Sequence, residues 1–169
     1  VTKAVAKAVE DAATQALAAL VEARQQEGVR LGREIERLCK NLATLLSKIE
    51  KRLPKAQEVL AGRLKERVEL ALSKIERTEP IDLARELVLL AERADVQEEV
   101  ARLHIHLDRL ADKLRLGGAL GRELEFLVQE CHREVTTLGN KSSDSVLSEF
   151  VVAQKLVLQQ MKEQLANVE

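Results

Sequence analysis

The chain has 169 residues, of which 46% are hydrophobic but only 1% aromatic, and its formal net charge is −1. Charged residues reach 33%, whereas there are only 7 glycines and 2 prolines, a composition typical of long helices or coiled coils. The longest apolar runs, 16–21 and 87–91, are far shorter than the roughly 20 residues that a membrane-spanning helix needs, so no membrane contact is expected.

Charge is unevenly distributed along the chain. Residues 30–77 contain 13 Lys or Arg against 7 Asp or Glu, whereas residues 81–169 contain 11 against 16. The basic stretch could face the phosphates of RNA. The alternative is an ordinary solvated helix face on which the two signs alternate.

The first predicted element is a helix over about residues 3–52. Its apolar residues step by four and three, as in a coiled-coil seam: Leu31, Ile35, Leu38, Leu42, Leu45 and Ile49. The seam continues backward through Leu17, Val21, Arg24 and Gly28. A second helix is expected to begin at Pro54, because a proline suits the first helical turn. Residues 1–79 are therefore predicted to form one domain, a long helical hairpin.

Thr78-Glu79-Pro80 predicts a break, because a residue before proline avoids the helical conformation, and Asp82 can cap the next helix. A seam over residues 96–114, a turn at Gly117-Gly118 and a seam over 120–138 follow. That last helix is expected to end at Gly139-Asn140. Candidate caps for a final helix are Ser142, Ser143 and Asp144.

No segment alternates with a period of two, so no sheet is expected. The predicted fold class is all-α, with long helices in antiparallel helical hairpins that form an elongated, coiled-coil-like bundle. Residues 80–169 form its C-terminal part. Cys39 and Cys131 lack metal-type spacing and are expected to be free thiols in a reducing cytoplasm.

Polar residues also recur at helical spacing on both sides of the Gly117-Gly118 turn. Before it, the residues Asp95, Glu99, Arg102 and His106 share one face; after it, Glu130, Glu134, Thr137 and Lys141 share another, with Arg133 adjacent. If the helices fold back, residue i lies opposite about residue 235 − i. This register predicts that His106 lies near Glu130, Arg102 near Arg133, and Asp95 near Lys141.

Converging carboxylates can hold Mg²⁺ or Mn²⁺, arginines can stabilise charge on phosphoryl oxygens, and a histidine can transfer protons near neutral pH. The alternative is that these residues form interhelical salt bridges beside a coiled-coil seam. The shortage of aromatic residues indicates that any grip on RNA is mainly electrostatic.

Several blocks of the sequence resemble one known family. The residues are ELVLLAERADVQEEVARL at 86–103, GRELEFLVQE at 121–130, Arg-x-x-Glu-Gly at 24–28, and the ending MKEQLANVE at 161–169. Together, and in this order, they resemble the YicC/YloC-type endoribonucleases. Glu125 stands where that family usually has Asp, and Cys131-His132 where it has Met-Asn.

The resemblance implies a bacterial, cytoplasmic endoribonuclease that cleaves single-stranded RNA with a divalent metal, Mn²⁺ or Mg²⁺. It also implies a ring-like homo-oligomer, possibly a hexamer, a link to RNA turnover and stress, and no action on DNA. A further region is expected before Val1. The alternative is a helical scaffold for oligomerisation or RNA binding, with catalysis in that missing N-terminal region.

The residues of the family blocks and of the two polar faces give the predicted site. The predicted catalytic residues are Glu99, Arg102, His106, Glu130, Arg133 and Glu134. Those predicted to bind RNA are Arg24, Arg93, Arg122 and Lys141. Those predicted to hold the metal are Asp95, Glu98, Glu99 and Glu130.

Overall fold

A computed structural model describes residues 2–74, 95–118 and 120–166 of the chain. Its elements are α1 (Lys3–Lys74), α3 (Gln97–Leu116), α4 (Gly121–Lys141) and α5 (Ser145–Leu165). Every element of the described residues is a helix, which confirms the predicted all-α class. None of these helices contains a stretch both long and apolar enough to cross a membrane.

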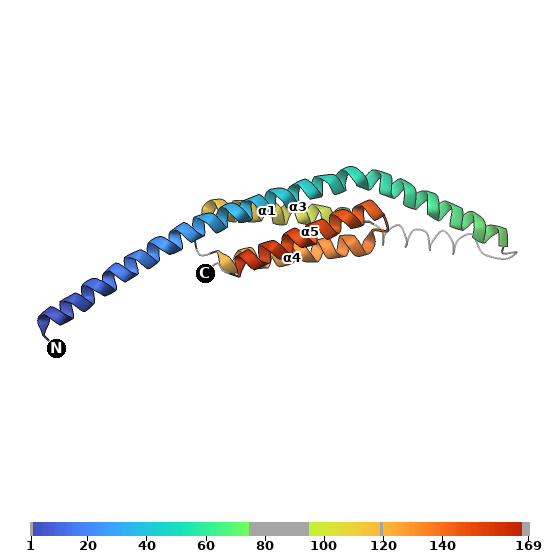
Figure 1. The fold of residues 1–169 in the computed structure, drawn as a ribbon. Coiled ribbons are helices and arrows are strands. Elements are labelled where there is room, and N and C mark those ends of the chain that lie inside the picture. The colour runs from blue at the N-terminus through green and yellow to red at the C-terminus, as the bar shows by residue number, and fades with distance from the viewer. Residues whose placement is uncertain (1, 75–94, 119, 167–169) are drawn as a thin grey trace.

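The helices form a four-helix bundle around the central part of α1. Helices α3, α4 and α5 run in alternating directions beside it, so that α1 is antiparallel to α3 and α5 and parallel to α4 (Figure 1). Contacts between neighbours link α1 with α3 and α5, and α4 with α3 and α5. Helix α4 therefore lies diagonally opposite α1. Short connections between antiparallel neighbours are the usual arrangement of such bundles.

Helix α1 is continuous for 72 residues, or about 110 Å of helix, and Pro54 lies inside it. The break predicted before Pro54 is therefore wrong. A proline inside a helix removes one backbone hydrogen bond and pushes away the preceding turn, which usually bends the helix without ending it when packing holds both sides. Leu53 and Ala56, on either side of the proline, both pack against the core, and α1 bends in its middle part (Figure 1).

The core lies where the three shorter helices cover α1. From α1 it takes Ile35, Leu38, Leu42, Leu46 and Ile49, of which none is more than 2% exposed. The sequence seam named Leu45, but Leu46 is the buried residue, because a helix of 3.6 residues per turn drifts from a strict heptad. The seams predicted over residues 96–114 and 120–138 are confirmed, and α5 adds a third buried stripe. The buried residues of the three shorter helices include Leu103, Leu110, Leu124, Cys131, Val135, Leu138, Leu147, Leu158 and Met161.

The connection between α3 and α4 depends on its two glycines. Gly117 and Gly118 have φ values of 67° and 105°, a left-handed region that residues with a Cβ rarely adopt. The chain reverses there, as predicted. The hairpin brings the polar faces of α3 and α4 together.

The connection between α4 and α5 is fixed by Asp144, one of the predicted caps. Its carboxylate accepts a hydrogen bond from the backbone N–H of Leu147 at 3.0 Å and two from the guanidinium of Arg52 in α1, at 3.1 and 2.7 Å. One side chain thus begins α5 and joins it to α1. The hydrogen bonds from Arg52 hold the pKa of Asp144 below its ordinary value.

Gly139 does not end α4, which continues to Lys141. A Cβ at this position would lie 2.8 Å from a methyl carbon of Val151 in α5, so the absence of a side chain lets the two helices approach. The end predicted at Gly139-Asn140 is therefore wrong: the glycine serves packing between helices, while the chain turns after Lys141.

Both cysteines are free thiols, as predicted. Burial raises the pKa of Cys39 to about 11 and that of Cys131 to about 12. Since the thiolate is the reactive form, neither thiol is a nucleophile near neutral pH in the folded chain.

The N-terminal part of α1 extends beyond the other helices (Figure 1). There the predicted seam is exposed to solvent: Leu17 is 63% exposed and Val21 53%. The break at residues 78–80, the cap at Asp82 and the domain boundary after residue 79 lie outside the described residues.

Candidate metal and RNA site

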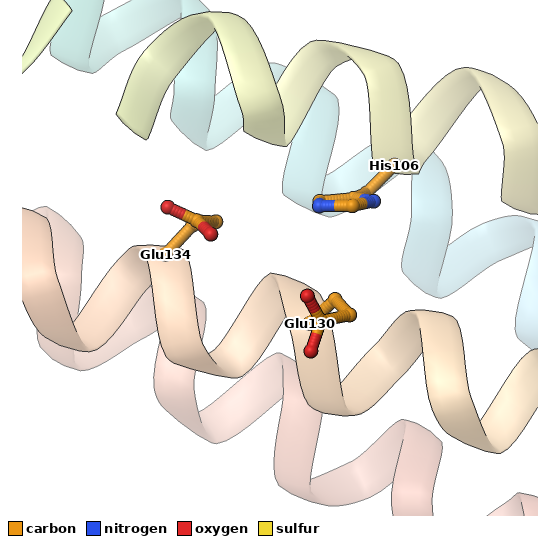
Figure 2. A group of neighbouring side chains, drawn as sticks. All are labelled: His106, Glu130 and Glu134. Carbon is orange, nitrogen blue, oxygen red and sulfur yellow. The ribbon is translucent and has the colours of Figure 1, made fainter. Parts of the chain in front are cut away.

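Polar side chains of α3 and α4 meet between the two helices of the hairpin. His106 projects from α3 toward Glu130 and Glu134 on α4 (Figure 2). One ligand atom from each of the three residues lies within 4.8 Å of the other two. We call these three residues the His106 cluster. Its position matches the register predicted for the folded-back helices, in which His106 faces Glu130.

Glu134 is the most buried member of the cluster, with a side chain 3% exposed. It lies beside the core residue Val135 and one helical turn after Glu130, on the same face of α4. A buried carboxylate needs compensating charge. Arg102 of α3 supplies it at 3.6 Å, and Arg133 supplies a second guanidinium at 3.3 Å.

The two arginines each bridge more than one carboxylate. Arg102 also pairs with Glu98, one turn earlier in its own helix, and Arg133 lies 3.2 Å from Glu130. Glu98 first, and Glu134 second, raise the pKa of Arg102. Both guanidiniums are about half exposed, so they combine contact with the cluster and access from solvent.

The imidazole of His106 completes the cluster. Its Nδ1 atom is buried and has no hydrogen-bond partner among the described residues. A buried polar atom without a partner is costly and calls for a ligand, a water or an ion. An imidazole nitrogen with two carboxylate oxygens is a donor set that binds divalent cations.

The residues predicted to hold a metal divide into two groups. Glu130 belongs to the His106 cluster, whereas the other three make different contacts. The Asp95 carboxylate accepts from the backbone N–H of Gln97 at the start of α3. Glu98 pairs with Arg102, and Glu99 with Lys141.

The ion pair between Glu99 and Lys141 joins the first turn of α3 to the last turn of α4. The Lys141 Nζ atom lies 2.7 Å from a carboxylate oxygen of Glu99, whose side chain is 6% exposed. The sequence register predicted Asp95 as the residue near Lys141, whereas the ion-pair partner in the structure is Glu99, four residues further along the chain. This contact corresponds to the salt-bridge alternative considered for the two faces.

The residues predicted to bind RNA are dispersed. Arg24 is exposed on the projecting part of α1, and Arg122 is exposed at the start of α4. Lys141 is in the pair with Glu99. Arg93 lies outside the described residues.

Comparison with known proteins identifies the family. Residues 49–169 match the family model described as endoribonuclease YicC-like, C-terminal. The chain belongs to this family. It is 34% identical over 146 residues to a probable endoribonuclease YicC of Haemophilus influenzae, which covers 86% of this chain and 50% of that protein.

A probable endoribonuclease YicC of Clostridioides difficile is 32% identical over 163 residues, or 96% of this chain and 54% of that relative. The chain therefore spans about half the length of the curated relatives it matches. The family resemblance seen in the sequence blocks is confirmed. All three residues of the His106 cluster lie inside the matched region.

Proposed function

We propose that the protein is a divalent-metal-dependent endoribonuclease that cleaves single-stranded RNA at the His106 cluster between α3 and α4. The observation that carries this proposal is the His106 cluster. It joins one imidazole and two carboxylates, whose ligand atoms lie within 4.8 Å of one another, and it lies in the part of the chain that matches a YicC-like endoribonuclease family. The two relatives named as probable endoribonucleases support the same reaction class.

The chemistry of the cluster fits a resident cation. Carboxylate oxygens suit Mg²⁺ and Mn²⁺, and an imidazole nitrogen suits transition metals, so Mn²⁺ satisfies both kinds of ligand. His106, Glu130 and Glu134 would hold it, each through one ligand atom. A bound divalent cation supplies Lewis-acid assistance to phosphodiester hydrolysis.

The surrounding cations have a separate task. Arg102 and Arg133 hold their guanidiniums beside the cluster, half exposed, where they can donate paired hydrogen bonds to phosphoryl oxygens. Such donors act best when they are fixed before the substrate arrives, and the carboxylate of Glu134 fixes both. On this proposal Glu99 and Lys141 act as a structural pair that sets the spacing of α3 and α4.

The test combines metal binding with cleavage. Electron paramagnetic resonance of Mn²⁺ titrated with the chain is expected to show binding that His106→Gln and Glu134→Gln abolish. Glu149→Gln, which removes an exposed carboxylate on α5, is the matched control and should bind as the parent does. Cleavage of a labelled single-stranded RNA by the full-length gene product should be lost in the same two variants and retained in Glu149→Gln. Parent-like cleavage by both cluster variants would refute the proposal.

The exposed seam on α1 supports a second role, as a scaffold for a homo-oligomer. Val9, Leu17 and Val21 are each more than half exposed, although their helical spacing is that of a packed seam. Apolar side chains of this kind commonly mark an interaction surface. Light scattering after size-exclusion chromatography should give a smaller particle for Leu17→Ser than for the parent. If the parent protein is already monomeric, this role is refuted.

A further inference from the structure

An apolar pocket opens at the α3–α4 hairpin, outside the His106 cluster. Its volume is about 610 Å³, and its lining includes Arg109 and Leu116 of α3 and Arg122, Phe126 and Leu127 of α4. We call it the Phe126 pocket. Its volume falls within the range of sites that bind small molecules and cofactors.

The apolar side chains of this pocket are unusually exposed. Phe126 is 60% exposed and Leu116 78% exposed, whereas the other aromatic residue, Phe150, packs against the core. An open aromatic face is a platform on which a nucleobase can stack. Phe126 is thus an exposed aromatic ring in a chain with an aromatic content of only 1%.

The charges around the pocket are only partly neutralised. Lys113 pairs with Glu123 across the hairpin, and Asp112 pairs with Arg115. Arg109 and Arg122 have no ion-pair partner among the described residues. Among the described residues, the rim of the pocket thus presents two arginines without an ion pair beside an aromatic ring, a combination that matches a planar base joined to phosphates.

The Phe126 pocket and the His106 cluster lie on the same two helices, α3 and α4. Phe126 precedes Glu130 by four residues on α4, and Arg109 follows His106 by three residues on α3. Residues with these spacings share one helix face and lie one turn, about 5–6 Å, apart. That step is comparable with the spacing of successive nucleotides in an extended strand. The pocket therefore lies one step from the cluster on the side of the Gly117-Gly118 turn.

We propose that the Phe126 pocket is a nucleotide subsite, in which a base of single-stranded RNA stacks on Phe126 while Arg109 and Arg122 contact the flanking phosphates. This inference rests on the proposed function for its choice of ligand. It adds the subsite that would position the strand over the His106 cluster. A second protein chain in this pocket would have to supply carboxylates to neutralise the two arginines. An RNA strand supplies both a base that stacks on the ring and phosphates that pair with the arginines.

Binding is measured without cleavage, by fluorescence anisotropy of labelled oligouridylate in the presence of a chelator. Phe126→Ala is expected to weaken binding by about tenfold, the effect of losing one stacked base. Leu156→Ala, which truncates a similarly exposed apolar residue on α5, is the matched control and should bind as the parent does. An oligomer with the same backbone and no bases should bind parent and Phe126→Ala equally.

Two further variants test the geometry directly. Phe126→Trp should keep the affinity and, because the chain contains no other tryptophan, its fluorescence should be quenched on addition of oligouridylate. Arg109→Gln and Arg122→Gln should each lower the slope of log affinity against log salt by about 0.7, the value for one phosphate contact on a single strand. Lys162→Gln, an exposed cation on α5, should leave that slope unchanged.

The outcomes separate this inference from the proposed function. If Phe126→Ala binds oligouridylate like the parent, the subsite is refuted, whatever the cluster variants do to cleavage. If Phe126→Ala changes the molecular mass of the particle but not its affinity for RNA, the pocket is a protein contact instead. A parent chain that does not bind oligouridylate also overturns the subsite. Loss of cleavage in the cluster variants with RNA binding retained would leave both proposals standing.

Discussion

Replacing Lys141 by methionine tests whether the ion pair with Glu99 is structural. The substitution keeps most of the apolar stem of the lysine and removes its charge, so the Glu99 carboxylate, 6% exposed, would stay buried without its counterion. Removing one member of a buried pair costs roughly 3–5 kcal/mol. Because Lys141 itself is 30% exposed, we take the lower end, about 3 kcal/mol. For a chain of this size that corresponds to a fall in Tm of about 6–12 °C.

The assay is urea unfolding followed by circular dichroism at neutral pH, for the parent, Lys141→Met and the double variant Glu99→Leu/Lys141→Met. The double variant should recover most of the loss, because replacing a whole buried ion pair by apolar residues is often neutral or stabilising. It should also bind RNA with the affinity of the parent. A loss below about 0.5 kcal/mol in Lys141→Met, within the scatter of ordinary surface substitutions, would refute the structural reading. So would weakened RNA binding by a stably folded double variant.

Three other substitutions or modifications test the bundle. Gly139→Ala should lower the free energy of unfolding by up to about 2 kcal/mol, because overpacking of about 1–3 kcal/mol outweighs the gain of about 1 kcal/mol in helix propensity. Gly32→Ala, where an added Cβ meets nothing within 4 Å, should instead stabilise by up to about 1 kcal/mol, and equal effects in chemical unfolding would contradict the close approach at Gly139. Asp144→Asn keeps a capping oxygen but loses the charge paired with Arg52. Because the folded pKa of Asp144 is lowered, its stabilisation is present above the unfolded value of about 3.9 and disappears as pH falls through the folded pKa. The difference in unfolding free energy between parent and Asp144→Asn should therefore shrink on acidification, and a constant difference would contradict the ionised pair. Cys131, with its pKa raised to about 12, should react with a thiol reagent at mildly alkaline pH only after unfolding, and fast labelling of the folded chain would show that the bundle opens readily.

Much of the fold could be predicted because helical periodicity is a local property of the sequence. The seams of α3, α4 and α5 appear as steps of three and four, and the paired glycines at 117–118 mark the reversal. What could not be predicted depends on packing between helices. Pro54 would end an isolated helix, but Leu53 and Ala56 pack on both sides of it and α1 continues. Gly139 has the sequence signature of a helix end, yet a close approach to α5 explains it.

The site could be predicted only to the level of helix faces. A single assumption of equal rise on both arms brought His106 opposite Glu130. It could not choose between Asp95 and Glu99, which lie one turn apart on the same face, and the structure pairs Glu99 with Lys141. The burial of Glu134 had a signal in its neighbours, since Cys131 and Val135 flank it on the seam. Phe126 had none, because an aromatic residue at helical spacing usually belongs to a core.

Two connections between α3 and α4, one at each end of the hairpin, flank the proposed site. At one end the pair of Glu99 and Lys141 joins the two helices, and at the other end the turn at residues 117–118 joins them covalently. Between these fixed points lie both the His106 cluster and the Phe126 pocket. On this view, weakening either fixed point should reduce cleavage by altering the spacing of ligands, even though neither fixed point contacts the substrate.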